Sequence, residues 1–523
     1  MTEEKSLPRK RSVATLVAAG TLATVAGCTA GPSIRPAVVT NEGPVPPGQT
    51  SQTGPPPPPP LRPPSSNSVQ WNTCDSVITG RFATPLPAGV EVECARMSSV
   101  LDSPYAPGRG TTRLTLLKAG NGPVPVVVVN DVDGLPGTAF AALLAAKLPR
   151  DMLDRISLVG MDRRGTGSSE PVRCVPEEIR ATLLDNDPAR LDMEPVLDAA
   201  RRAGQQCVIN LDNRLPAIDT WRTASDLEKL RNDLGMPHLH AIGRGEGSRV
   251  LTTYAERYPR TVGRMVLDGH PDPSADRMIA LEPVPAGLEA TFSAFAAACV
   301  TKGGCPLGPD PRGAVTALLE SLRARPLPID EERSITAGTV LGILRQQLAE
   351  PEQWPQLAAA LAKTRAGDAS GLSAAATTMV DDVRGQPPKL DIGLVTGCND
   401  TSSRLPPERF NAAAKTWQTQ SPLFGALVAQ ELVVCSPWPV PTQAVPTPSA
   451  KGTPPIVMLA TAADPVTPQV GTERTAGRLS STSTVTWHGT GHGALTRSSC
   501  ATDAARAFLL DGQVPRNGLV CPP

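Results

Sequence analysis

The 523-residue sequence predicts an α/β fold with a mostly parallel central sheet, and three observations lead to this prediction. Residues 124–129 form an unbroken apolar run, which is typical of a strand buried on both faces of a parallel sheet. Residues 238–268 read as an apolar strand, a glycine-dense turn, an amphipathic helix and a second apolar strand. Further short strands follow a long stretch of alanine- and leucine-rich helices, and such alternation favours a parallel sheet.

The amino terminus has the pattern of an export signal. Lysines and arginines between positions 5 and 11 precede the apolar residues 13–26, a run shorter than the ~20 residues of a membrane-spanning helix. Small residues then lead into Cys28, as in a bacterial lipobox, where the cysteine is lipidated. We therefore expect a lipoprotein-type signal peptide at residues 1–28, with an ordinary signal peptide as the alternative. The protein is expected to be exported, either lipid-anchored on the outer face of the cell membrane or secreted, and no later segment is expected to span a bilayer.

Residues 29–68 are rich in Pro, Gly, Ser, Thr and Gln, and positions 55–60 are all proline. Proline lacks a backbone N–H and favours the extended polyproline II conformation. The sequence predicts a linker without a core, which at ~3.1 Å per residue spans up to roughly 100 Å. A proline-rich ligand for a partner protein is the alternative.

Charge and composition exclude several classes of partner. The 50 Lys and Arg residues balance the 50 Asp and Glu residues, and aromatic residues make up 3% of the chain. We therefore expect no nucleic-acid binding, and no membrane contact other than a lipid anchor at Cys28. No motif indicates a metal or an organic cofactor, and none is expected.

The cysteines indicate disulfides in an oxidising compartment. The chain has eleven, and setting Cys28 aside leaves ten, an even number without a C-x-x-C zinc motif. Taken in sequence order, they give five expected pairs: Cys74 with Cys94, Cys174 with Cys207, Cys299 with Cys305, Cys398 with Cys435, and Cys500 with Cys521.

The globular part divides into a first core segment (69–272), a helical lid without strands (273–440) and a second core segment (441–523). In the first segment, a helix expected at 220–234 places charged residues opposite a Leu/Trp face. The second segment carries the last two strands and a helix at 501–510. The expected strands are 113–117, 124–129, 156–159, 239–242, 265–267, 456–459 and 484–487.

The glycine-dense turn, residues 243–247, fits two motifs. As G-x-G-x-x-G, with Ser248 in place of the last glycine and Asp268 as the acidic residue, it resembles a dinucleotide-binding turn. As G-x-S-x-G, it resembles a nucleophile elbow in which Gly245 replaces the serine. Export from the cytoplasm disfavours nicotinamide binding.

Other motifs decide between these interpretations. They are DRRGTGS at 162–168, YAERYP at 254–259 running into VLDG at 266–269, CND at 398–400, DPVTP at 464–468 and GHG at 491–493. Together and in this order they resemble the exported tripeptidyl and prolyl aminopeptidase-like branch of the α/β-hydrolases, including its TAP-like carboxyl-terminal region. The resemblance covers nearly all of the globular part and implies an α/β-hydrolase fold rather than a dinucleotide-binding one.

The resemblance also implies site positions. Asp464 takes the place of the catalytic acid and His492 that of the base, while the nucleophile position is Gly245. The family's oxyanion loop is glycine-rich, whereas this chain has Asp131 and Asp133, whose charges would oppose an oxyanion.

We therefore expect a catalytically impaired member of this family, with a lidded pocket for a peptide or another envelope ligand. The alternative is an active peptidase or esterase that uses an unrecognised nucleophile, and a third possibility is a structural lipoprotein without a binding pocket. Replacement nucleophiles are disfavoured. Ser248 and Glu246 are displaced from the elbow position, and the resemblance places Ser168 and Ser169 in a structural loop.

Overall fold

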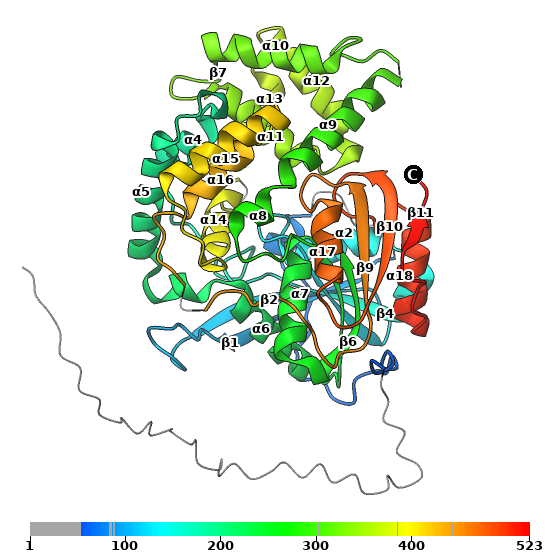
Figure 1. Ribbon diagram of the computed structural model, residues 1–523. Coiled ribbons are helices and arrows are strands. Elements are labelled where there is room, and N and C mark those ends of the chain that lie inside the picture. Colours follow the sequence, from blue (N-terminus) through cyan, green and yellow to red (C-terminus); the bar gives the residue numbers. More distant parts are fainter. Residues whose placement is uncertain (1–53, 83–85, 87–88, 302, 384, 442) are drawn as a thin grey trace, which may run out of the picture. The chain divides into compact units, whose positions relative to one another are not determined.

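The central element of the fold is a nine-stranded sheet. The structure is a computed structural model, and it describes residues 54–82, 86, 89–301, 303–383, 385–441 and 443–523. The expected signal peptide at residues 1–28, with Cys28, and residues 29–53 of the expected linker lie outside the described residues. In spatial order (Figure 1) the strands are β1 (Val92–Val100), β2 (Thr111–Ala119), β4 (Ile156–Met161), β3 (Val124–Val129), β5 (Leu239–Arg244), β6 (Val262–Asp268), β9 (Ile456–Ala463), β10 (Thr482–Thr490) and β11 (Leu519–Cys521).

The sheet is parallel from β4 to β11, and the two pairs at one edge, β1 with β2 and β2 with β4, are antiparallel. All six residues of β3 are buried, which confirms the interpretation of that valine run. Two strands were not predicted. β1 has a mixed polar sequence, and β11 follows β10, so three strands and not two come after the helical segment.

Helices cover both faces of the sheet (Figure 1). On one face Phe140 of α2 (Gly137–Lys147) and Phe508 of α18 (Ser499–Asp511) are buried in the same apolar cluster. On the other face, Leu227 of α6 (Thr220–Asp233) and Val250 of α7 (Glu246–Arg257) are buried in a second apolar cluster. The helices of the core are completed by α1 (Ser76–Thr79), α3 (Arg150–Leu153) and α17 (Gln469–Ala476), with 3-10 turns at Asp212–Ala217 and Pro259–Thr261.

Helix α6 begins where predicted, with Asp219 as its N-cap accepting from the Arg222 amide at 2.7 Å. The expectation that its charges oppose its buried face is wrong for two of them. Arg222 is 5% exposed and Asp226 is fully buried, because each has an ion-pair partner in the interior, Asp219 and Arg164 respectively.

The helical lid lies between β6 and β9 and has its own apolar core. The expectation of a strand-free segment is wrong, since β7 (Leu327–Pro328) and β8 (Ser334–Ile335) form a short hairpin. Helix α5 (Glu194–Leu211), which precedes β5, also contributes Met193 from its N-cap and Val196 to this core. The remaining helices are α4 (Glu177–Asp185), α8 (Arg277–Leu281), α9 (Val284–Thr301), α10 (Pro311–Ala324), α11 (Ala337–Gln347), α12 (Trp354–Arg365), α13 (Ser370–Val380), α14 (Lys389–Asn399), α15 (Pro407–Gln420) and α16 (Gly425–Val434), with 3-10 turns at Pro188–Arg190 and Pro351–Gln353.

The stretch Arg277–Thr301 is long and apolar enough to cross a membrane by length and composition, contrary to the expectation that no later segment would be. Its side chains Leu288, Phe292 and Phe295 are buried in the core of the helical lid, which accounts for the apolar composition.

The last part of the expected linker is bound to the domain. Pro59 is buried, and its carbonyl accepts a hydrogen bond from Nε of Arg264 at 2.8 Å. The amide of Ser68 donates to the carbonyl of Asp233 at 2.8 Å, and Leu61 packs against the sheet. The prediction of a free spacer is therefore wrong for residues 54–68, because a proline-rich segment keeps carbonyl acceptors and apolar rings that a surface can bind.

The disulfide prediction is confirmed. The structure contains the five pairs in sequence order: Cys74–Cys94, Cys174–Cys207, Cys299–Cys305, Cys398–Cys435 and Cys500–Cys521. Each joins segments near one another in sequence, so they tie helix and strand ends within local regions of the domain.

Candidate active site

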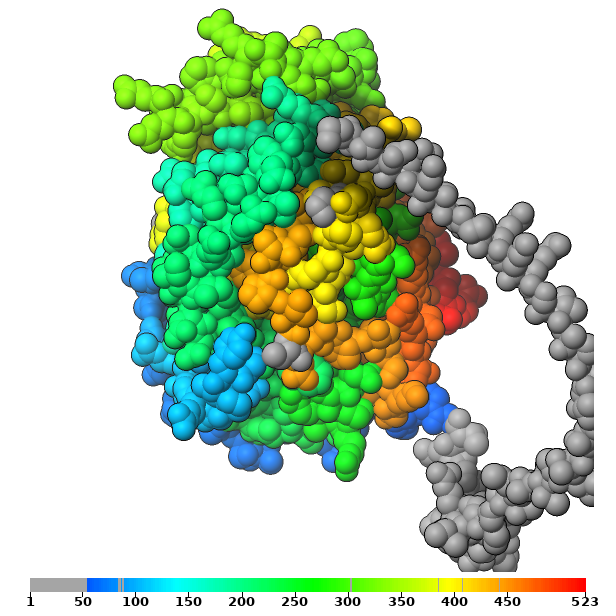
Figure 2. All heavy atoms as spheres, turned by 60° about the vertical axis from the view of Figure 1, so that its left-hand side comes forward, coloured from blue at the N-terminus to red at the C-terminus, as the bar shows by residue number. Residues whose placement is uncertain are grey.

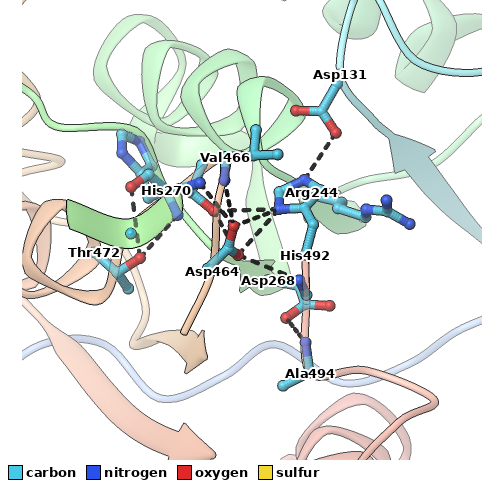
Figure 3. A network of polar contacts seen from close by, with 12 residues as sticks. Asp131, Arg244, Asp268, His270, Asp464, Val466, Thr472, His492 and Ala494 are labelled. Atoms are coloured by element: carbon cyan, nitrogen blue, oxygen red, sulfur yellow. Dashed lines mark hydrogen bonds and ion pairs between the residues drawn. The ribbon is translucent and has the colours of Figure 1, made fainter. Parts of the chain in front are cut away.

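Asp464 and His492 lie together at the carboxyl edge of the parallel sheet (Figure 3). Asp464 follows β9, His492 follows β10, and the two strands are neighbours. Nδ1 of His492 is 3.0 Å from Oδ2 of Asp464, and both residues are buried, 2% and 1% exposed. The amides of Val466 and Thr467 each donate to Asp464 at 2.8 Å, which fixes the carboxylate against the imidazole.

The turn between β5 and α7 requires its glycines. A Cβ on Gly247 would lie 2.1 Å from the carbonyl oxygen of Val129, and one on Gly243 would lie 2.9 Å from the backbone of Ser248. Gly245 has φ 57° and ψ −121°, a backbone conformation that residues other than glycine rarely adopt. The strand and the helix therefore approach too closely for side chains at 243 and 247, and the turn is strained at 245.

The side-chain position of residue 245 is occupied by the carboxylate of Asp131, which extends from the loop after β3. A Cβ on Gly245 would lie 1.9 Å from Oδ1 of Asp131. The same oxygen accepts a hydrogen bond from the Glu246 amide at 2.8 Å, and the other, Oδ2, is 3.0 Å from Nε2 of His492. His492 thus lies between two carboxylates, Asp131 and Asp464 (Figure 3). The sequence drew attention to Asp131 but did not show that it contacts His492.

These charges fix the protonation of the site. Burial alone would lower the pKa of His492, but the charges of Asp464 and Asp131 outweigh it and raise this pKa to about 10. Burial would raise the pKa of Asp131, yet His492 lowers it to about 2, and the pKa of Asp464 is lowered by the same balance. At neutral pH the site is an imidazolium held by two carboxylates, and such an imidazolium has no lone pair with which to accept a proton.

Arg244 and Glu350 join this site to the helical lid. Glu350 lies 2.7 Å from Arg244 on one side and 2.5 Å from Arg497 on the other. The amide of His492 donates to the carbonyl of Ala349 at 2.9 Å. The lid therefore fixes the histidine loop directly. Arg244 and Glu350 lie 106 positions apart in sequence, and no motif indicated their contact.

Asp268, the acidic residue of the dinucleotide interpretation, has a structural role. It is 3% exposed and accepts hydrogen bonds from the amides of Ala494 (2.7 Å) and Leu495 (3.0 Å), immediately after His492. The Asp268 carboxylate is thus used by the histidine loop. The Asp131 carboxylate occupies the glycine turn, where a dinucleotide-binding protein would hold the pyrophosphate.

None of the considered replacement nucleophiles contacts His492. Ser248 is buried with an Oγ that has no partner among the described residues, and Glu246 pairs with Arg249 at 3.4 Å. Ser168 accepts a hydrogen bond from Arg81, and Ser169 accepts one from the Thr115 amide at 2.8 Å.

A cleft of about 250 Å³ is lined by Asp131 and Glu246 of the core and by residues of the helical segment, among them Arg345. His270 also lines it, and burial lowers the pKa of that histidine to about 3, so it is neutral and hydrogen-bonded to the hydroxyls of Thr252 and Thr475. Within the part of the chain that the structure describes, no group of three or more His, Cys, Asp or Glu side chains is arranged to hold a metal ion.

Asp400, the last residue of the CND motif, is also in this cleft and is 8% exposed. Its carboxylate accepts hydrogen bonds from the amide (2.8 Å) and the hydroxyl (2.7 Å) of Thr220, which begins α6. Burial, and then the charge of Asp219, raise the pKa of Asp400 to about 7. The folded state therefore binds this proton more tightly than the unfolded state does.

The free energy of unfolding is accordingly expected to fall as the pH rises from about 4 to about 7, with an Asp400 contribution of at most about 4 kcal/mol. In Asp400→Asn this contribution is absent, because the amide does not ionise. Urea unfolding of wild type and variant at pH 5 and pH 8 measures the difference, with the exposed Asp382→Asn as control. Parallel pH profiles for wild type and Asp400→Asn would contradict the expectation.

The strand order, the tight glycine turn after β5 and the paired Asp464 and His492 are those of an α/β-hydrolase fold. Residues 421–521 match the family model described as TAP-like protein. Serine protease Hip1 of Mycobacterium tuberculosis is 28% identical over 492 residues, covering 88% of this chain and 92% of that protein. The tripeptidyl aminopeptidase of Streptomyces lividans is 26% identical over 388 residues, 70% of either chain. A hydrolase structure from Pseudomonas aeruginosa aligns over 76% of this chain and 94% of its own, with 12% identity and a TM-score of 0.36. The protein therefore has an α/β-hydrolase fold, its carboxyl-terminal part is similar to the TAP-like family, and its relatives include a serine protease and an aminopeptidase.

Proposed function

We propose that this protein is an exported, non-catalytic member of the family, which binds a peptide or another envelope ligand in the cleft beneath its helical lid. One observation carries the proposal: the Asp131 carboxylate occupies the place of a side chain at Gly245 while contacting His492.

Three components of serine hydrolysis are missing from this site, and Asp131 accounts for two of them. Gly245, at the elbow, supplies no hydroxyl nucleophile. The imidazolium of His492 does not accept a proton. The Glu246 amide, which follows the elbow residue as an oxyanion donor does, already donates to Asp131. Losing any one of these would slow the reaction severely, and Asp131 also fills the space that a serine side chain at 245 would need.

The cleft supports a retained binding role. It remains open between the core and the helical lid, with a volume of about 250 Å³. Polar and charged side chains from both parts line it, among them Asp133, Arg249 and Arg345. A peptide offers amides and charged termini that such a lining can bind. A purely structural lipoprotein would not require this space.

Export is supported by the five disulfides, since bonds of this kind persist in oxidising compartments. Lipidation at Cys28, with attachment to the outer face of the cell membrane, remains part of the proposal on the strength of the sequence pattern.

Purified full-length protein is expected to hydrolyse neither tripeptidyl nor short acyl ester chromogens, and to resist labelling by a serine-directed fluorophosphonate. In parallel, an NMR titration of His492 should give a pKa of about 10, and Asp131→Asn should lower it, because one of the two charges that hold the proton is lost. A His492→Gln variant assigns the resonance.

Labelling or turnover by the wild type would overturn the proposal in favour of an active peptidase or esterase with another nucleophile. A His492 pKa near its ordinary value in the wild type would contradict the ion pair on which the proposal rests.

A further inference from the structure

A second cavity, of about 320 Å³, lies among the helices of the lid and adjoins the cleft. We call it the lid chamber. It shares several lining residues with the cleft, including Asp133, Gly397 and Glu431. Figure 2 shows the face on which the yellow segment of α14 and the orange segment that follows α16 meet the core. Most of the lining of the lid chamber is apolar and comes from α4, α5, α13, α14 and α16. The apolar side chains are Leu184, Val196, Met379, Leu394, Leu427 and Val434.

One polar side chain in this apolar wall lacks a partner. Gln430 of α16 lines the chamber and is 7% exposed, and its Nε2 forms no hydrogen bond with any described residue. A buried amide N–H without an acceptor costs about 1–3 kcal/mol, so such a group is typically satisfied by something that the cavity holds. No described residue of the protein supplies the hydrogen-bond acceptor that the Gln430 amide requires.

Among the charged side chains that line the lid chamber, cations exceed anions. Arg277, Arg345 and Lys389 line this region, against the carboxylates of Glu431 and Asp133. Glu431 pairs with both arginines, whereas Lys389 is exposed and forms no ion pair with a described residue. A ligand group here is therefore favoured if it is an anion and a hydrogen-bond acceptor.

From this combination we infer that the lid chamber binds a single-chain alkyl carboxylate. The alkyl chain lies among the leucines, valines and Met379, and the carboxylate accepts from Gln430 and faces Arg345 and Lys389. The inference rests on the proposed function, since it names a ligand class for a protein that binds rather than hydrolyses. It adds a site in the lid, distinct from the Asp131–His492 pair.

Dodecanoate is the probe, compared by calorimetry with dodecanol, dodecyltrimethylammonium and butanoate on the full-length protein. Dodecanoate should bind at least about tenfold more tightly than each of the others, because only it has both the anion and the chain. Equal binding of dodecyltrimethylammonium would overturn the assigned charge, and equal binding of butanoate would overturn the role of the apolar wall.

Gly397 offers a variant that fills the chamber without disturbing the fold. A Cβ at this position of α14 meets nothing within 4 Å, so a larger side chain enters the space where chamber and cleft meet. Gly397→Leu should weaken dodecanoate binding about tenfold or more, and the matched Gly397→Ala should not. Gln430→Leu should weaken dodecanoate binding more than dodecanol binding, because a hydrogen bond to an anion is stronger than one to a hydroxyl. Unchanged dodecanoate binding in both Gly397→Leu and Gln430→Leu would overturn the site.

The same samples separate this inference from the proposed function. Absence of dodecanoate binding by the wild type overturns the inference and leaves the non-catalytic assignment standing. Turnover of the chromogenic esters by the wild type overturns that assignment, whatever the calorimetry gives.

Discussion

The double variant Asp131→Ala/Gly245→Ser is expected to hydrolyse short acyl esters, whereas Gly245→Ser alone is expected to remain inactive. In the single variant, the new Cβ would meet Oδ1 of Asp131 at 1.9 Å, so the serine and the carboxylate cannot occupy their places together. Removing the carboxylate frees the Glu246 amide, lowers the pKa of His492 and opens the space for the hydroxyl. All three components of hydrolysis then return together.

Loss of triad groups reduces kcat by up to ~10⁶ in serine hydrolases, so even a partial recovery should exceed the background by roughly 10³-fold. Initial rates with a chromogenic acetyl or butyryl ester, together with fluorophosphonate labelling, measure the gain. Asp131→Ala alone is the matched control and should stay inactive. Activity of Gly245→Ser without the second change would show that Asp131 does not block the site.

Replacing Arg164 by methionine is expected to lower the free energy of unfolding by about 3–5 kcal/mol. Arg164 is 3% exposed and pairs with the fully buried Asp226 at 2.6 Å. It also donates to the carbonyls of Val100, Leu101 and Ala217. Without the guanidinium, a buried carboxylate and three carbonyls lose their donor.

Urea unfolding followed by circular dichroism measures this loss. Arg173→Met is the matched control, because its ion pair with Asp382 is exposed and should contribute less than about 1 kcal/mol. In Arg164→Met/Asp226→Leu part of the stability should return, since no buried charge then lacks a partner. Equal losses for Arg164→Met and Arg173→Met would contradict the assignment of Arg164 as the buried anchor of this region.

Local sequence patterns predicted most of the sheet. The valine run of β3 and the glycine turn after β5 carry their own physical signals: unbroken burial in the first, and the close approach of Val129 to Gly247 in the second. Strand β1 was not predicted, because its sequence mixes polar and apolar residues. The alternation that leaves Ala95 and Met97 buried is therefore not evident from the sequence. The disulfides were predictable because each joins cysteines adjacent in sequence order.

The contact at the centre of the site could not be predicted in this way. Asp131 and His492 are 361 positions apart, and no local pattern encodes a contact over that distance. From the sequence, Asp131 appeared as a charge that opposes an oxyanion; in the folded chain it is the partner of an imidazolium. The buried pair of Arg164 and Asp226 was missed for a related reason, since helical periodicity assigns charges to the outer face unless a buried partner is known.

If the protein is anchored through Cys28 as proposed, the contact between Pro59 and Arg264 has a consequence for its release by proteolysis. Because the chain is already bound to the domain from the end of the proline run onward, a protease that cuts ahead of Gly54 would shed the globular part with its segment 54–68 still in place. The five disulfides, the cleft and the lid chamber all lie after that cut. Anchored and shed forms would therefore have the same ligand affinity and differ only in where that ligand is held.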